Sequence, residues 1–254
     1  MTTTTRKSTN RLATLLLGAS LLAGCTVSGI AETTAHAAGA SNFLQENAAI
    51  RTITKNASGK TFVTNKLSTA VLVNKQRNLP STYVPADLVV PNVPFSFAGS
   101  SPKKQMRGIA ADALEKLFAA AKKDGIKLAA VSGYRSYATQ KAIFDRNQAI
   151  KGADVANRTS ALPGQSEHQT GLAMDISSAS AGYALEASFG DTKEGKWLAK
   201  HAPEYGFIIR YGKGMEKLTG YSYEPWHVRY VGVYIAKEIT NKHLTLEQYL
   251  AQYN

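Results

Sequence analysis

The chain has 254 residues, a formal net charge of +12 and a single cysteine. One cysteine excludes an intrachain disulfide, and a hydrophobic fraction of 44% is typical of a soluble folded domain. The excess of Lys and Arg favours contact with anionic surfaces such as wall polymers or lipid head groups. We do not expect nucleic acid as a partner, because the aromatic residues do not alternate with basic runs.

The first residues have the pattern of a bacterial export signal. The basic residues Arg6, Lys7 and Arg11 precede an apolar run over residues 12–22. A basic start followed by a short apolar run is typical of a secretory signal, and this run is too short to remain as a membrane-spanning helix. We therefore predict a signal peptide over residues 1–24.

The signal ends in Leu-Ala-Gly-Cys at residues 22–25, which resembles the bacterial lipobox. In that motif the cysteine is acylated and becomes the mature N-terminus. We therefore predict lipidation of Cys25 and an exported lipoprotein, held at the cell membrane and facing the cell wall. Cleavage near Ala38, after the small-residue pattern at residues 35–37, is the alternative.

Residues 25–70 predict a tether and an N-terminal segment ahead of the folded domain. Residues 26–40 are mostly Ala, Thr, Ser and Gly, a composition typical of a flexible linker. Apolar residues are scattered through residues 41–70, and no role follows from them. The apolar run over residues 70–74 predicts a strand, and the domain itself is predicted over residues 71–254.

Helices and strands alternate through the predicted domain. Apolar residues three and four apart predict a helix over residues 106–121, with Gly125 placed to end it. We expect a buried strand over residues 126–131 and a second amphipathic helix over residues 137–150. Strict alternation over residues 172–177 predicts a strand with one face in the core.

The last third of the chain completes the expected fold class. We expect a helix around residues 196–201, strands near residues 207–210 and 226–231, and two further helices before the C-terminus. The elements do not repeat in a βαβ rhythm. The sequence therefore predicts an α+β fold in which a small antiparallel or mixed sheet is flanked by helices.

Three residues have the types and surroundings that catalytic zinc requires, namely His168, Asp175 and His227. Such sites use about three nitrogen or oxygen ligands and leave one position open. Asp175 lies on the strand face opposite the core, and Gly171 allows the loop with His168 to turn back over it. We therefore predict that these three side chains meet at one metal site.

Glu224 and Trp226 stand close to the third candidate ligand in the sequence. On a regular strand, Glu224 and His227 would lie on opposite faces because they are three residues apart. Pro225 favours an extended backbone at Glu224, and we expect a bend there to bring both side chains to the metal. Three aromatic residues are candidates for the walls of the cleft: Tyr134, Tyr223 and Trp226.

Two segments form an uncommon combination: Ser166-x-His168-x-x-Gly171-x-Ala173-x-Asp175, and later Glu224-x-Trp226-His227. This combination resembles the VanY-type D-alanyl-D-alanine carboxypeptidases. They belong to the wider LAS group of zinc peptidases, which includes lysostaphin-type enzymes and the hedgehog signalling domain. The resemblance runs from about residue 71 to the C-terminus and includes three further stretches: residues 72–75, residues 79–85, and residues 132–136 with Gln140.

The resemblance implies an activity, a fold and a set of partners. The activity is removal of the terminal D-alanine from peptidoglycan stem peptides, with Zn²⁺ as cofactor. Residues 71–254 would then form a zinc carboxypeptidase domain with the LAS-type fold. Stem peptides are the expected substrate, the lipid on Cys25 is the expected membrane contact, and we expect a monomer.

The resemblance also implies a role for each site residue. His168, Asp175 and His227 are expected to hold zinc, and Glu224 to act as the catalytic base. Arg135 resembles the family arginine that binds the substrate and stabilises the transition state. Three further residues are expected to contact the substrate: Ser166, Gln140 and Trp226.

Three alternatives stay open on the sequence. An LD-carboxypeptidase would share the metal chemistry, because loops that the sequence does not place decide the stereochemistry. An endopeptidase that cuts cross-links would differ by a cleft open at both ends. A catalytically inactive zinc-containing binding module is expected to lack Glu224 or Arg135, and both are present.

Overall fold

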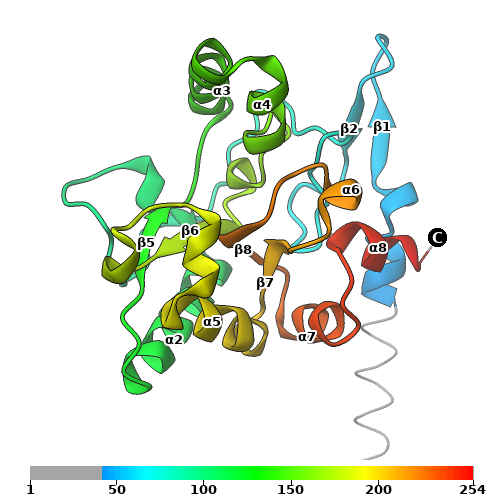
Figure 1. Ribbon diagram of the computed structural model, residues 1–254. Coiled ribbons are helices and arrows are strands. Elements are labelled where there is room, and N and C mark those ends of the chain that lie inside the picture. Colours follow the sequence, from blue (N-terminus) through cyan, green and yellow to red (C-terminus); the bar gives the residue numbers. More distant parts are fainter. Residues whose placement is uncertain (1–41, 254) are drawn as a thin grey trace, which may run out of the picture. The chain divides into compact units, whose positions relative to one another are not determined.

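A four-stranded antiparallel sheet lies at the centre of the computed structural model, which describes residues 42–253 (Figure 1). The order of strands across the sheet is β5-β6-β8-β7, and every neighbouring pair is antiparallel. The strands have these bounds: β5 Ala129–Ser132, β6 Ala173–Ser177, β7 Phe207–Tyr211 and β8 Glu224–Tyr230. With helices on both sides of this sheet, the predicted α+β class is confirmed.

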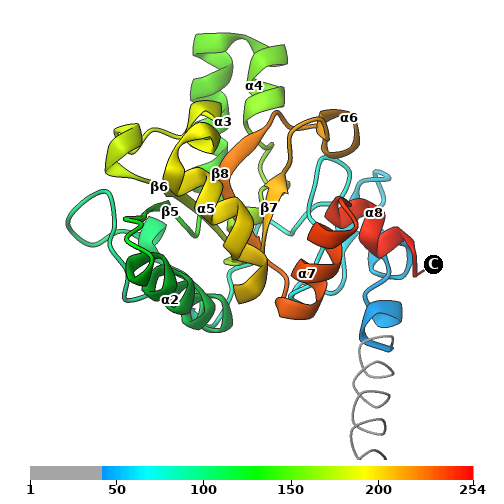
Figure 2. The same cartoon turned by 60° about the horizontal axis from the view of Figure 1, so that its bottom comes forward.

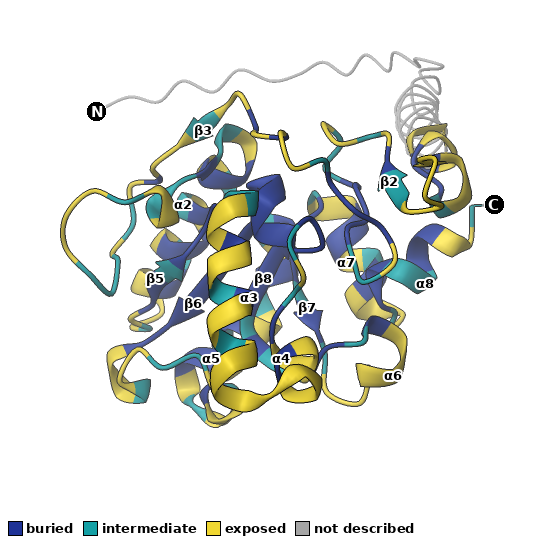
Figure 3. Cartoon of the chain, turned by 90° about the horizontal axis from the view of Figure 1, so that it is seen from above, coloured by how far each residue is buried: buried dark blue, intermediate teal, exposed yellow. Residues whose placement is uncertain are grey.

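Helices cover the two faces of the sheet and its β7 edge (Figures 1 and 2). In Figure 1, α2 and α5 lie below the sheet, whereas the α3–α4 pair stands above it. Helix α3 is exposed along most of its length, as Figure 3 shows. The helices have these bounds: α2 Gly108–Lys123, α3 Tyr137–Lys151, α4 Ala153–Thr159, α5 Lys193–His201, α6 Glu216–Thr219, α7 Val233–Asn241 and α8 Leu246–Ala251.

Local signals in the sequence set the ends of the two long helices. Helix α2 ends just before Gly125, whose φ of +73° belongs to the left-handed region that glycine adopts without strain. Helix α3 begins after Ser136, whose side chain accepts a hydrogen bond from the backbone N–H of Thr139 at 3.1 Å. It ends at Gly152, with φ of +80°. Both predicted helices are thus confirmed, with small shifts at their ends.

The main core lies between the sheet and helices α2 and α5. From β6 it receives Met174 and Ile176, and from β8 it receives Val228. Because side chains alternate along a strand, Asp175 then points to the opposite face, as the sequence predicted. That opposite face of the sheet carries the candidate site.

Residues 42–70 belong to the same compact unit as the rest of the described chain. Leu44 and Ala70 are buried in a second apolar cluster together with residues of α7 and α8. A hairpin of β1 (Ile53–Lys55) and β2 (Thr61–Val63) extends from this segment. The burial of Leu44 and Ala70 therefore links the N-terminal segment to the C-terminal helices.

The strand predicted over residues 70–74 is wrong. The run is buried, but its only ladder contact is an isolated bridge between Asn74 and Arg77. The carbonyl oxygen of Val71 accepts a hydrogen bond from Arg229, and that of Leu72 accepts one from Arg77, at 2.7 and 3.0 Å. Arginine side chains thus satisfy carbonyl groups that a neighbouring strand would otherwise satisfy.

The remaining elements are short. The strand predicted over residues 126–131 begins only at Ala129, because the N–H of Ile126 bonds back to Ala121 at the end of α2. The described part also contains two more strands, six 3₁₀ helices and a helical stretch over residues 42–46: β3 Leu88–Val89, β4 Met106–Arg107, η1 Ala49–Arg51, η2 Pro102–Lys104, η3 Glu167–Thr170, η4 Ala179–Ala181, η5 Ala187–Asp191 and η6 Ala202–Tyr205.

The predictions for the export signal, for Cys25 and for the tether over residues 26–40 concern residues outside the described part. Among residues 42–253, the structure contains no helix with the length and apolar character needed to cross a membrane.

Candidate active site

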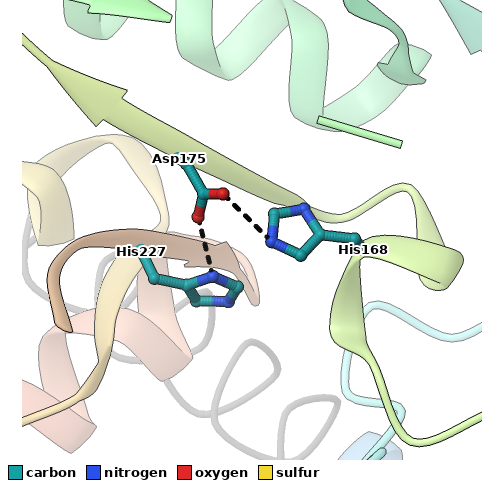
Figure 4. A group of neighbouring side chains, drawn as sticks. All are labelled: His168, Asp175 and His227. Atoms are coloured by element: carbon teal, nitrogen blue, oxygen red, sulfur yellow. Dashed lines mark hydrogen bonds and ion pairs between the residues drawn. The ribbon is translucent and has the colours of Figure 1, made fainter. Parts of the chain in front are cut away.

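Three buried side chains, those of His168, Asp175 and His227, converge on the face of the sheet opposite the main core (Figure 4). Their candidate ligand atoms all lie within 4.8 Å of one another. Nε2 of His168 is 3.4 Å from Oδ2 of Asp175, and Nδ1 of His227 is 3.0 Å from Oδ1 of the same carboxylate. The prediction that these three side chains meet is confirmed.

Each side chain reaches this point from a different element. Asp175 and His227 are direct partners across the β6–β8 ladder, so their backbone positions are fixed by the sheet. His168 lies on η3, and the turn after it is made by Gly171 with φ of +68°. A Cβ at residue 171 would lie 2.9 Å from side-chain atoms of both Arg107 and Leu88, so both the turn and the packing require glycine.

The outward ring nitrogens of both histidines have acceptors, as zinc ligands require. Nδ1 of His168 lies 2.7 Å from the carbonyl oxygen of Gly133, which leaves Nε2 for a metal. Nε2 of His227 lies 3.4 Å from Oε2 of Glu167, which leaves Nδ1 for the metal. Two imidazole nitrogens and a carboxylate oxygen form a donor set that fits Zn²⁺.

The surroundings also shift the pKa values of the three side chains. Burial, reinforced by Arg135, lowers the pKa of His168 to about 4, so its ring is neutral. Burial opposes protonation of His227, but hydrogen bonds to Asp175 and Glu167 outweigh it and raise the pKa to about 9. Burial disfavours the charged form of Asp175, yet the two histidines hold its pKa well below the usual range. A metal at Nδ1 of His227 would therefore replace a proton.

Glu224 lines the same cavity as His227, although the two are three residues apart. Between the pairs Ile209–Val228 and Tyr211–Glu224, β7 advances by two residues while β8 advances by four. This bulge confirms the expected departure from a regular strand. Burial raises the pKa of Glu224 to about 7, which is suited to taking up and giving back a proton near neutral pH.

The guanidinium group of Arg135 is held by two side chains. It donates to Oδ2 of Asp175 at 3.1 Å and to Oε1 of Gln140 at 3.0 Å. Gln140 is buried, and its amide nitrogen donates to the carbonyl oxygen of Ala161 at 2.8 Å. Gln140 is not among the residues that line the cavity, and its side chain contacts Arg135, Ser160 and Ala161, which do line it.

The cavity over these residues has a volume of about 350 Å³. Trp226, a predicted wall residue, lines it together with Ser166 and with Asn147 and Lys151 of α3. Tyr134 and Tyr223, which the sequence offered as wall residues, are not among the lining residues. Two other tyrosines are: Tyr211 and Tyr221.

Two buried donors in the cavity have no hydrogen-bond partner among the described residues. They are Nε of Arg135 and the hydroxyl group of Tyr221. A buried polar group without a partner costs free energy, so each such group in a folded protein calls for an explanation. Both atoms belong to residues that line the cavity.

A group of buried charges behind His227 was not predicted from the sequence. Glu167 accepts hydrogen bonds from Arg210 and Arg229, and all three side chains are fully buried. Burial disfavours the charged form of Glu167, but the two arginines hold its pKa far below the usual range. One signal was present in the sequence, because Arg229 and His227 are two residues apart on a strand and so share a face. In the structure, both side chains contact the carboxylate of Glu167.

The chain matches a family model described as VanY: D-alanyl-D-alanine carboxypeptidase, over residues 103–233. It is also 54% identical over 195 residues to YodJ of Bacillus subtilis (strain 168). That match covers 77% of this chain and 71% of YodJ.

Two solved structures are similar as well. The LdcB LD-carboxypeptidase matches with a TM-score of 0.74 and 54% identity, over 77% of this chain and 91% of LdcB. A mutant of the vancomycin-resistance D,D-pentapeptidase VanY from the VanB-type cassette, solved with Zn(II), matches with a TM-score of 0.59 and 33% identity. This second match covers 72% of this chain and 98% of VanY.

These similarities agree with the donor set formed by His168, Asp175 and His227, and they identify the cofactor as zinc. The identity to YodJ and the match to the family model both exceed what a shared fold alone would give. The chain belongs to the VanY family and is a zinc carboxypeptidase of that type.

Proposed function

We propose that this protein removes the terminal D-alanine from peptidoglycan stem peptides, with the tetrapeptide as its preferred substrate. The preference for the tetrapeptide is called here the LD preference. The observation that supports it is the 54% identity to the LD-carboxypeptidase LdcB over 77% of the chain. The identity to the D,D-pentapeptidase VanY is 33% over 72% of the chain. The motifs in the sequence favoured cleavage of the D-alanyl-D-alanine bond of the pentapeptide, and the family model supports that reaction as the second candidate.

The site supports hydrolysis of a peptide bond next to a free carboxylate. Arg135 and Tyr221 line the cavity, and each carries a buried donor without a partner among the described residues, namely Nε of Arg135 and the hydroxyl group of Tyr221. A substrate carboxylate or scissile carbonyl supplies acceptors, and a charged partner makes such hydrogen bonds stronger. The hydroxyl groups of Ser160 and Ser166 and the ammonium group of Lys151 belong to the same lining.

The proposed mechanism assigns one task to each group. Zinc, when held by His168, Asp175 and His227, supplies Lewis-acid chemistry that polarises the scissile carbonyl and lowers the pKa of water. The carboxylate of Glu224 takes the proton from the attacking water and passes it to the leaving amine of D-alanine. The guanidinium of Arg135 stabilises the negative charge that develops on the carbonyl oxygen, because it stays charged and offers several donors.

The test is mass spectrometry of defined stem peptides after incubation with the zinc-loaded protein. We expect the protein to release D-alanine from the tetrapeptide with a higher kcat/KM than from the pentapeptide. The Glu224→Gln variant is the control and should release no D-alanine from either peptide. A higher kcat/KM on the pentapeptide would reject the LD preference and support the DD reaction. Cleavage confined to cross-linked dimers would replace the proposal with an endopeptidase, and no cleavage of any substrate would reject it.

We also propose that the protein is exported, monomeric and anchored by a lipid on Cys25. The support is the basic and apolar signal that ends in the lipobox-like residues 22–25. We expect the wild type to fractionate with membranes and Cys25→Ser to be released or to keep its signal. A mature N-terminus near Ala38 would overturn the anchor, and light scattering of a lipid-free preparation tests the monomer.

A further inference from the structure

Glu167 lies between the metal ligand His227 and two buried arginines, and its two oxygens face different partners. Oε2 is 3.4 Å from Nε2 of His227. Oε1 accepts from Nε of Arg210 at 2.8 Å and from Nη1 of Arg229 at 2.6 Å. The side chains of Glu167 and both arginines have no solvent exposure, so no water competes for these contacts.

The arginines are themselves held by α8 and by residues 69–71. Arg210 donates to both oxygens of Glu247 on α8, at 2.9 and 2.6 Å. Arg229 donates to the carbonyl oxygens of Thr69 and Val71, at 2.9 and 2.7 Å. Two carboxylates thus balance two guanidinium groups, as buried charges require. This arrangement fixes Oε1 toward the arginines and leaves Oε2 for His227.

Whether Nδ1 of His227 can bind a metal then depends on which nitrogen of the ring carries the proton. A neutral imidazole carries one proton, and a nitrogen that bears it has no lone pair for a metal. For Nδ1 to ligate, the proton must sit on Nε2, which needs an acceptor. His168 has a backbone acceptor for its outward nitrogen, the carbonyl oxygen of Gly133. His227 instead depends on the side chain of Glu167.

We propose that Glu167 is the positioning residue that fixes the zinc-binding tautomer of His227, by accepting the Nε2–H through Oε2. This inference rests on the proposed ligation of zinc by His168, Asp175 and His227. Hydrogen-bond partners of metal ligands commonly set ring orientation and ligand basicity. The N-terminal segment and α8 then contribute to zinc affinity, since they hold the arginines that orient Glu167.

The substitution Glu167→Gln is a direct test, because the two ends of the glutamine amide differ. The oxygen accepts hydrogen bonds, whereas the NH₂ group donates them. Arginine offers only donors, so Arg210 and Arg229 will select the amide oxygen of the glutamine. The amide NH₂ group must then face Nε2 of His227, where it is a donor. The ring will respond by accepting at Nε2 and carrying its proton on Nδ1, which removes the lone pair that zinc needs.

The first experiment measures the dissociation constant of zinc by competition with a chromophoric chelator. We expect Glu167→Gln to bind zinc about 10–100-fold more weakly than the wild type. The matched control is Glu194→Gln, because Glu194 is a buried carboxylate on α5 that bonds Ser180 at 2.8 Å, away from the site. We expect the control to keep wild-type zinc affinity. A folded Glu167→Gln protein with unchanged zinc affinity overturns the inference.

The second experiment needs no substitution and covers the case in which Glu167→Gln does not fold. Imidazole ¹⁵N NMR of the zinc-loaded wild type reports which nitrogen of each histidine carries the proton. We expect a protonated Nε2 on His227 and a protonated Nδ1 on His168. Zinc on Nε2 of His227 overturns the inference while leaving the zinc peptidase intact. A wild type that binds no zinc at all rejects the proposed function itself.

Discussion

Asp175 and His227 face each other across strands β6 and β8, with Oδ1 of Asp175 3.0 Å from Nδ1 of His227. Two of the three candidate ligands are therefore fixed by one backbone ladder at the centre of the sheet. The third, His168, is fixed by the bond between its ring and the carbonyl oxygen of Gly133. A site built on paired strands holds its geometry before the metal binds, which favours affinity and catalysis.

The first prediction concerns the metal. The wild-type protein should hold about one zinc ion, and His227→Ala should lose most of it because one of three protein ligands is gone. His201→Ala is the control, since His201 stacks on Trp197 at the end of α5 outside the cavity. Metal analysis of the dialysed proteins measures both. Full zinc occupancy in His227→Ala would remove this residue from the site.

The second prediction separates proton transfer from metal binding. Glu224→Gln keeps the size of the side chain but cannot accept the proton of the attacking water. Turnover should fall by about 10²–10⁴-fold while the zinc content stays at the wild-type level. Glu216→Gln on α6, outside the cavity lining, is the control and should leave turnover unchanged. An active Glu224→Gln protein with full zinc would refute the assigned base.

The third prediction is the acid limb of the pH profile. Burial raises the pKa of Glu224 to about 7, and a nearby divalent cation lowers the pKa of a carboxyl group. The base works only when ionised, so kcat/KM should rise with pH and reach its plateau at or below about pH 7. Below that point it should fall about tenfold per pH unit. An acid limb of kcat/KM that lies above pH 8 would show that a group other than Glu224 controls it.

The fourth prediction concerns the arginine in the cavity. Lysine cannot donate at once to Asp175 and Gln140 while also facing the substrate, because it lacks the planar fork of Arg135. Arg135→Lys should therefore lower kcat by about 10²–10³-fold, nearly as much as Arg135→Ala. The exposed Arg146 on α3 gives the control, Arg146→Lys. Loss in KM alone, with kcat unchanged, would show that Arg135 binds without stabilising the transition state.

The fifth prediction follows from the unpartnered hydroxyl of Tyr221. Tyr221→Phe removes a buried donor that has no protein partner, so the free energy of unfolding should stay the same or rise. If the hydroxyl serves a charged acceptor of the substrate, kcat/KM should fall about tenfold or more. Tyr249→Phe on α8, outside the cavity, should leave kcat/KM unchanged. Wild-type activity in Tyr221→Phe would exclude contact with the substrate.

Local patterns in the sequence were enough to predict the main helices, the strand with Asp175 and the three metal ligands. Period and capping act within a few residues, so α2 and α3 were predicted to within a few residues at each end. The run over residues 70–74 shows where such reasoning fails. Its apolar pattern indicates burial, but the arginines that bond its carbonyl oxygens come from elsewhere in the chain, among them Arg229.

The sequence by itself determined the zinc-binding residue types, their order and the face of the strand on which Asp175 lies, because these depend on local chemistry and on a period of two. Only the tertiary structure decided that Gln140 accepts a hydrogen bond from Arg135, that Tyr221 lines the cavity, and that Glu167 supports His227. The contact between Glu167 and His227 joins residues that are 60 positions apart in the chain. Such contacts depend on how the elements pack, and no local pattern specifies them.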